Sequence, residues 1–361
     1  MRAKSVVWMV PIENGQNIEE VKSKFSILLQ ESDFQQRMCL KEKEIIAIKM
    51  HFGEGNTYGY IKPPIVKILV DKIKAKKARP FLAETSAVYI GTRRDAVDHL
   101  ELASRHGFDC SQVGVPVIIV DGVYGENSAS VQVNKKHFKE VQIAAGILQV
   151  QGLVSLAHFK GHDLVGFGGS LKNIAMGLAN RVGKVQQHMN VRPYVVEERC
   201  RFCQKCMQKC PVNAIKEHNK KAFIEQTACI GCGECVAACP NLAVIFKWEE
   251  GVVVFEEKMM EYAFGILKHL NKTYFINCVY TITKFCDCMQ CENPTIVPDI
   301  GILASIDPVA LDKATNDLVL ERVGKDIWKE LHPQCDWKRQ LEYAQEIGLG
   351  QLRYIIKKIT D

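Results

Sequence analysis

The stretch CRFCQKCMQKCP at residues 200–211 has the same cysteine spacing as CIGCGECVAACP at residues 229–240. Each copy reads C-x2-C-x2-C-x3-C-P, a run in which three thiolates wrap one iron–sulfur cluster while the fourth reaches the neighbouring cluster. The spacing therefore predicts two [4Fe-4S] clusters with crossed ligands. We assign them as Cys200, Cys203, Cys206 and Cys239 for the first cluster and Cys229, Cys232, Cys235 and Cys210 for the second.

Tandem copies of this run are the signature of a two-cluster bacterial ferredoxin, here over residues 195–247. A pair of zinc sites is the alternative, but zinc does not account for the doubled x2-x2-x3-P period. Within residues 195–247, eight Lys and Arg residues outnumber five Glu residues. This excess predicts either an acidic redox carrier as partner, such as a ferredoxin or flavodoxin, or simply solvated lysines.

Outward from the cysteines, short apolar runs alternate with amphipathic segments. The runs predict strands at 6–10, 45–50, 80–84, 116–120, 153–159, 273–279 and 300–305. The amphipathic segments predict helices at 17–32, from 64, at 93–106, at 256–270, from 307, at 337–347 and at 351–359. We therefore expect an α/β fold, doubly wound around a mostly parallel sheet, with an inserted ferredoxin-like domain. The α/β domain comprises 1–194 and 248–361.

Composition narrows the class of protein. The chain of 361 residues has fifteen cysteines and no eighteen-residue apolar run, which favours metal ligation in a reducing cytoplasm and no membrane partner. Its net charge of +6 is scattered and has no aromatic-interleaved basic stripe, so nucleic acid is not expected as a partner. The oligomeric state does not follow from composition.

Polar residues follow four of the predicted strands. Ligands of open parallel sheets bind beyond the carboxyl ends of the strands. We therefore expect a cleft at this edge that holds either a divalent metal or an anionic substrate whose protons the histidines and lysine move. The candidates are His51, Glu54, Glu84, Asp121, His158, Lys160 and His162. Each alone can also be read as a hydrogen-bonded structural residue.

The segment GFGGSLKNIAMG at 166–177 adds a glycine-rich turn before a helix. Gly168 and Gly169 let backbone approach a ligand, Ser170 can cap the helix, and Lys172 lies in its first turn. The segment fits an anion or a phosphate-bearing cofactor, although it is not a Walker loop. The alternative is a turn that merely permits tight packing.

These motifs resemble the DUF362 family of iron–sulfur-centre proteins, whose domain brackets a two-cluster ferredoxin. The resemblance rests on IKMHFGEGN (48–56), HFKGH (158–162), GFGGSLKNIAMG (166–177) and PDIGILASIDPVALDKA (298–314). It implies cluster binding and a redox role, and it assigns no substrate. It also singles out Cys286 and Cys288, because the family carries a Cys-Asp-Cys at this place.

The stretch KFCDCMQCEN at 284–293 leaves three interpretations open. Cys286 and Cys288, with Cys291 and Cys278, form a candidate third site for zinc or a cluster. Cys286 and Cys288 can instead be a redox or nucleophilic pair, or unliganded buried thiols. Cys39, Cys110 and Cys335 are isolated and are interpreted as small apolar residues.

Together these observations predict an oxidoreductase of unknown substrate. Its two clusters relay electrons between an external carrier and the cleft, where His158, Lys160, His162, Lys172 and the Cys286/Cys288 pair act. A flavin or another cleft ligand is left open. The alternatives are a ferredoxin-like carrier or adaptor whose α/β part docks a partner enzyme, and a metal- or nucleotide-binding protein with structural clusters.

Overall fold

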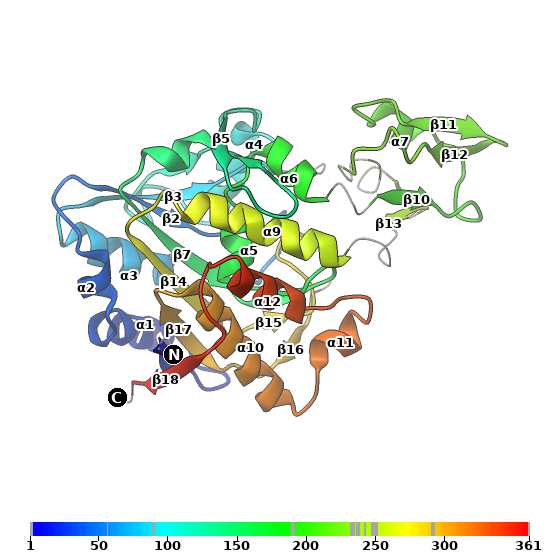
Figure 1. The fold of residues 1–361 in the computed structure, drawn as a ribbon. Coiled ribbons are helices and arrows are strands. Elements are labelled where there is room, and N and C mark those ends of the chain that lie inside the picture. Colours follow the sequence, from blue (N-terminus) through cyan, green and yellow to red (C-terminus); the bar gives the residue numbers. More distant parts are fainter. Residues whose placement is uncertain are drawn as a thin grey trace.

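The computed structural model describes residues 3–55, 57–88, 91–188, 192–231, 235, 239–241, 243–246, 252–289 and 293–359. Its centre is an eight-stranded sheet in the order β18-β1-β17-β14-β7-β2-β3-β4 (Figure 1). The strands are β1 (Ser5–Pro11), β2 (Ile45–Lys49), β3 (Arg79–Glu84), β4 (Val117–Ile119), β7 (Gly152–His158), β14 (Thr273–Val279), β17 (Gly301–Ser305) and β18 (Tyr354–Lys358). The predicted α/β class is confirmed.

The sheet is mostly parallel. Strands β14, β7, β2, β3 and β4 pair in parallel with their neighbours, and β1 pairs in parallel with β18. Strand β17 runs antiparallel to β1 and β14. Because parallel strands end on the same side, the residues that follow β2, β3, β4 and β7 meet at one edge.

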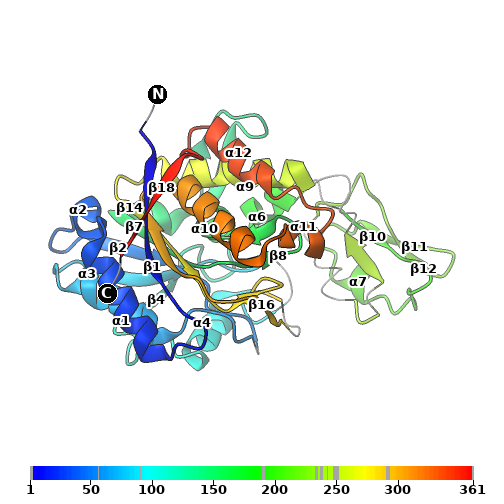
Figure 2. The same cartoon turned by 90° about the horizontal axis from the view of Figure 1, so that it is seen from below.

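Helices cover both faces of the sheet (Figure 2). One face packs against α1 (Ile18–Glu31), α2 (Phe34–Met38) and α3 (Pro63–Lys74), with α4 (Ala96–Arg105) contributing beside them. The other packs against α5 (Ser170–Ala175), α9 (Val252–Leu267), α10 (Pro308–Val323) and α12 (Lys338–Glu346). Short elements η1 (Ala145–Gln149), α6 (Arg181–His188) and α11 (Ile327–Leu331) complete this side. Among the described helices, none has both the length and the apolar character needed to cross a bilayer.

Local sequence signals fix several helix starts. The Asn17 side chain accepts hydrogen bonds from the backbone N–H groups of Glu19 and Glu20. The Glu20 side chain accepts one from Asn17 N–H, which completes a capping box. Asp307 caps α10 by accepting from Val309 and Ala310, and Pro308 occupies the first helical position.

One predicted element is wrong. Residues 351–359 were expected to form a helix, but Tyr354–Lys358 form the edge strand β18 beside β1. The run YIIKK carries too few residues to fix a helical period, and parallel pairing with β1 supplies the backbone partners that decide the outcome.

Five small two-stranded sheets accompany the main sheet, three outside the cysteine-rich segment and two within it. The pairs are β5 (Ser128–Gln132) with β6 (Glu140–Ala144), β8 (Lys160–His162) with β9 (Gly166–Gly168), β15 (Ile282–Thr283) with β16 (Thr295–Val297), and two pairs in the cysteine-rich segment. In that segment β10 (Pro193–Val195) pairs with β13 (Val244–Phe246), and β11 (Ile215–His218) pairs with β12 (Lys221–Ile224) near α7 (Lys205–Gln208). This segment forms a lobe beside the main body (Figures 1 and 2).

Candidate functional site

Side chains from several strand ends line a cavity of about 60 Å³ at the carboxyl edge of the sheet. The cavity lies where β2 and β7 end and where β9 leads into α5. The predicted residues that line it are His51, His158, Lys160, Gly168, Gly169 and Lys172. Segments that are far apart in the sequence therefore meet at one place.

Asp287 is a buried carboxylate that pairs with two of these residues, Lys160 and His158. Its Oδ2 lies 2.8 Å from Lys160 Nζ and 3.0 Å from His158 Nδ1. Burial alone would raise the pKa of Asp287, but the charges of Lys160 and His158 hold it well below its usual range. Burial would likewise lower the pKa of Lys160, yet Asp287 and Cys286 outweigh it and raise this pKa. Asp287 was not among the site residues predicted from the sequence.

Lys49, which ends an apolar strand, is hydrogen-bonded to Asn173, a residue that lines the cavity. Its side chain is 1% exposed, and Nζ lies 2.8 Å from Glu84 Oε1 and 3.0 Å from Asn173 Oδ1. Asn173 in turn donates to Lys49 O at 3.0 Å and to Ser155 Oγ at 2.9 Å. Lys49 and Asn173 were missed from the sequence. Lys49 could have been recognised as a candidate because it is a charged residue within the apolar run 45–50.

The predicted carboxylates Glu54, Glu84 and Asp121 are not among the residues that line the cavity, and each binds other groups of the fold. Arg93 Nε lies 2.8 Å from Glu54, and Arg93 Nη1 lies 3.2 Å from Glu84. Burial alone would raise the pKa of Glu84, but Lys49 and Arg93 lower it to about 2. Asp121 accepts from Ser86 N at 3.0 Å. Buried carboxylates need such partners, and these lie within the fold itself.

His51 presents a donor to the cavity. Gly53 N–H donates to its Nδ1 at 2.9 Å, which places the ring proton on Nε2. Burial, followed by the charges of Arg93 and Lys160, holds the pKa of His51 well below its usual range. Its buried Nε2 has no hydrogen-bond partner among the described residues. The neutral ring therefore has one unused N–H.

The start of α5 binds a side chain of this protein, contrary to the expected ligand at Gly169 and Ser170. Asp312 accepts from Ser170 N and Leu171 N, each at 2.9 Å. A Cβ at Gly169 would collide with the Asp312 carboxylate. The glycine here serves tight packing, because it lets α10 bring its carboxylate against the helix start.

His162 is also placed differently from our expectation. It is buried on β8, its Nδ1 accepts from Leu164 N at 3.1 Å, and it is not among the residues that line the cavity. Burial, with Lys172 and His332 nearby, holds its pKa well below its usual range. The structure gives His162 a role in fixing the turn after β8.

Cys286 and Cys288 lie beside the cavity in the turn that carries Asp287. Lys172 Nζ lies 3.7 Å from Cys286 Sγ, and Cys286 is 3% exposed. The hydrogen bond from Cys288 and the charges of Lys172 and Lys160 outweigh burial and hold the pKa of Cys286 well below its usual range. This turn therefore brings a thiolate, a thiol and a lysine together.

Cys278, another cysteine of the candidate third site, does not join them. Cys278 is fully buried in the apolar core against α1 and α3, where burial raises its pKa to about 12. Cys291 lies outside the described residues. Within the described ranges, no group of three or more His, Cys, Asp or Glu side chains is arranged to hold a metal ion.

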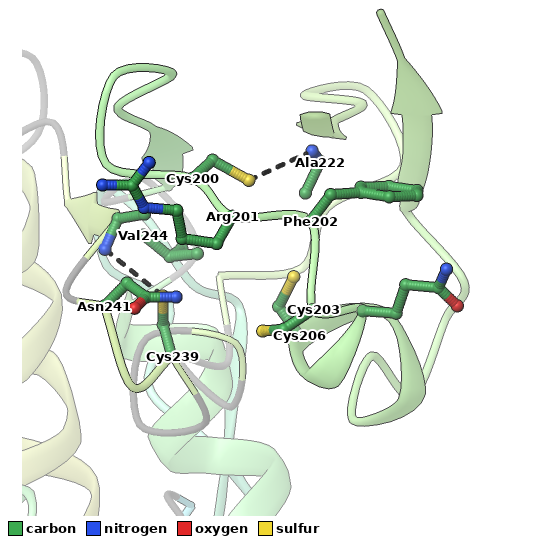
Figure 3. Close-up of a pocket in the computed structure, with 11 residues that line it drawn as sticks. Cys200, Arg201, Phe202, Cys203, Cys206, Ala222, Cys239, Asn241 and Val244 are labelled. Carbon is green, nitrogen blue, oxygen red and sulfur yellow. Dashed lines mark hydrogen bonds between the residues drawn. The ribbon is translucent and has the colours of Figure 1, made fainter. Parts of the chain in front are cut away.

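The cysteine-rich lobe contains a cavity lined by thiols from both motifs (Figure 3). Cys200, Cys203 and Cys206 lie on one side, and Cys239 of the second motif completes the set. Backbone amides support two of the sulfurs, Ala222 N at 3.5 Å from Cys200 Sγ and Ala243 N at 3.2 Å from Cys239 Sγ. The cavity thus places together the four thiols that the spacing assigns to one cluster.

A second cavity in the lobe mirrors the first. It is lined by Cys210 of the first motif and by Cys229 and Cys235 of the second, among otherwise apolar side chains and Pro193. Ala214 N lies 3.1 Å from Cys210 Sγ, at the same four-residue interval as Ala243 from Cys239. Cys232 lies outside the described residues.

Comparisons with known proteins place the chain in a family. No curated protein matches it. Two solved structures are similar, each at a TM-score of 0.40. The first is a lactate racemase apoprotein from Thermoanaerobacterium thermosaccharolyticum, with 14% sequence identity over 75% of this chain and 50% of that chain. The second is a protein from Thermotoga maritima, with 10% sequence identity over 93% of this chain and 60% of that chain. The chain thus spans 50% to 60% of their lengths. The model of the domain of unknown function DUF362 matches residues 46–317, and the chain belongs to the DUF362 family.

Proposed function

We propose that the protein is an iron–sulfur redox protein that passes electrons through two [4Fe-4S] clusters between an external carrier and a ligand in the cavity at the carboxyl edge. The observation that carries this proposal is the crossed grouping of the cysteine thiols around two separate cavities. Thiolates in this arrangement, with backbone amides directed at the sulfurs, are the surroundings of ferredoxin clusters. The clusters would supply one-electron transfers.

The thiols fit the proposed clusters by their chemistry. Among the described residues that line the two lobe cavities there is no Asp, Glu or His, so the metal ligands that these residues offer are thiolates. Cys200, Cys203, Cys206 and Cys239 would hold one cluster, and Cys210 with Cys229, Cys232 and Cys235 the other. Zinc also takes four thiolates, and metal analysis separates the two possibilities.

An acidic carrier suits the surface of the lobe. Six of its described basic side chains, Arg199, Arg201, Lys205, Lys209, Lys216 and Lys220, are exposed. Charges of one sign around a redox centre steer a partner of the opposite sign and raise the rate of encounter. We therefore propose a small acidic protein, of the ferredoxin or flavodoxin kind, as the electron donor or acceptor.

The ligand of the cavity is proposed to be a small anion. Lys160, Lys172 and the Nε2–H of His51 present donors to it, and no Asp or Glu is among its lining residues. Lys160 is already paired with Asp287, so Lys172 has the larger share of charge free for a ligand. Lysine and imidazole N–H groups bind carboxylate and phosphate oxygens.

The substitution Lys172→Gln tests the cavity. We expect at least one anion among phosphate, sulfate, acetate and oxalate to raise the melting temperature of the native protein. Loss of a charged hydrogen bond, worth about 1.5–3 kcal/mol, should weaken that binding by about 10- to 100-fold. Calorimetric titration measures the affinity.

Lys67→Gln is the matched control, because Lys67 is exposed on α3 and paired with Asp71. It should bind the anion like the native protein, and both variants should keep their iron. If none of the four anions binds the native protein, the anionic-ligand proposal is wrong and the α/β part is better explained as a docking platform for a partner enzyme.

A further inference from the structure

The turn that carries Cys286 and Cys288 is held in place by the surrounding chain. Met289 N–H donates to Cys286 O at 3.0 Å, which closes a β-turn over Cys286, Asp287 and Cys288. Asn293 fixes the entry to the turn, since it accepts from Phe285 N and donates to Phe285 O, both at 2.8 Å. The two cysteines therefore keep a constant relation to the cavity.

The turn also brings the two sulfurs together. In an extended strand, residues two apart are separated by roughly 6.6 Å, near the upper limit of the Cα separations that disulfides span. The β-turn closed by Met289 N–H and Cys286 O draws the two residues closer than that. Cys286 is buried and Cys288 is half-buried, so one member can be reached from solvent.

The surroundings distinguish the two sulfurs. Lys172 Nζ lies 3.7 Å from Cys286 Sγ, and its charge favours the thiolate form of Cys286, whereas the pKa of Cys288 is raised well above its usual range. A thiolate is the reactive form in thiol–disulfide exchange, and a neighbouring thiol can complete the bond. The pair therefore has the parts of a redox-active dithiol.

Among the described residues, no third side chain joins Cys286 and Cys288 as a metal ligand. Asp287, between the two cysteines, is engaged by Lys160 and His158. Cys278 lies in the apolar core on the other face of the sheet. The two sulfurs are fewer than the four ligands of a structural zinc site, and Cys291 lies outside the described residues.

We propose that Cys286 and Cys288 cycle between a dithiol and a disulfide at the wall of the cavity. The electron source rests on the proposed function: two electrons, which bound clusters would supply one at a time, would break the S–S bond, leaving Cys286 as a thiolate beside Lys172 and Cys288 with one proton taken from solvent. In the reverse direction, the two sulfurs lose two electrons, Cys288 loses its proton, and the S–S bond forms. The pair would thereby join two one-electron carriers to a two-electron reaction.

The test uses the full chain with reconstituted clusters, kept anaerobic and poised in glutathione buffers of graded potential. After acid quenching and alkylation, peptide mass spectrometry should find a Cys286–Cys288 disulfide that appears in one two-electron transition and disappears with dithiothreitol. Cys286→Ser and Cys288→Ser should each abolish it, whereas Cys39→Ser, which changes an exposed cysteine, should not. Lys172→Gln should slow alkylation of Cys286 on the order of tenfold.

The outcomes separate the two proposals. Thiols that stay free at every potential, or zinc that is released from the native protein but missing from Cys286→Ser, would overturn the dithiol. If the disulfide forms in glutathione but photoreduced clusters fail to reduce it, the redox-active Cys286–Cys288 pair is supported. The proposed transfer of electrons from the clusters to the cavity is then wrong.

Discussion

Cys210→Ser is expected to remove about four of roughly eight irons from the anaerobically reconstituted protein, because each crossed ligand set holds one four-iron cluster. Cys210 comes from the first motif but lies in the cavity of Cys229 and Cys235. Its loss should therefore expose the thiols of the second motif to alkylation, while Cys200, Cys203 and Cys206 stay protected. Iron analysis measures the loss of iron, and mass spectrometry of alkylated peptides shows which thiols have become exposed.

Cys110→Ser is the matched control for this substitution. Cys110 is exposed and lies outside the lobe, so its variant should keep all of the iron. Alkylation of Cys200 and Cys203 in Cys210→Ser, with Cys229 protected, would mean that the ligands are not crossed and that our assignment is wrong.

Asp287→Asn should destabilise the protein by about 3–5 kcal/mol, since removing one partner leaves buried charge uncompensated. Lys160 and His158 both pair with this carboxylate, and their side chains are 9% and 2% exposed. Chemical denaturation of the anaerobic holoprotein measures the free energy of unfolding. The change in volume is small, so the loss would reflect charge and not packing.

Asp71→Asn provides the comparison, because it breaks the Lys67–Asp71 pair, whose side chains are 48% and 56% exposed. An exposed pair of this kind contributes less than about 1 kcal/mol. If the two variants lose equal stability, the Asp287 network does not stabilise the fold as we describe.

The same network predicts a pH dependence. The pKa of Asp287 is held below its usual range in the folded protein, so its contribution to stability is complete above the unfolded value of about 3.9. That contribution is lost as the pH falls through the lower folded pKa. Native protein should therefore lose stability faster than Asp287→Asn on acidification below about pH 4.

The strands of the main sheet could be predicted because buried parallel strands are nearly continuous apolar runs. Runs such as 45–50 and 273–279 contain enough apolar residues to show this pattern, and their carboxyl ends locate the cavity. Residues 354–358 could not be assigned in this way, since their conformation depends on pairing with β1, which lies at the other end of the chain.

Site partners were harder to predict than strand ends. His158 and Asp287 are separated by 129 positions, and nothing near either residue indicates the other. Lys49 and Arg93 likewise take the carboxylates that we expected to bind a cofactor. The sequence could indicate that charged groups gather at this edge, but which of them neutralise one another depends on side-chain geometry in the folded chain.

The central claim is that two redox-active four-iron clusters occupy the lobe. An electron paramagnetic resonance titration of the reconstituted protein, with iron and sulfide measured on the same sample, tests it most directly. We predict about eight irons, about eight sulfides and two one-electron reductions at potentials between roughly −700 and +450 mV. Zinc in place of iron, or a single cluster that does not change its oxidation state in this range, would contradict the account.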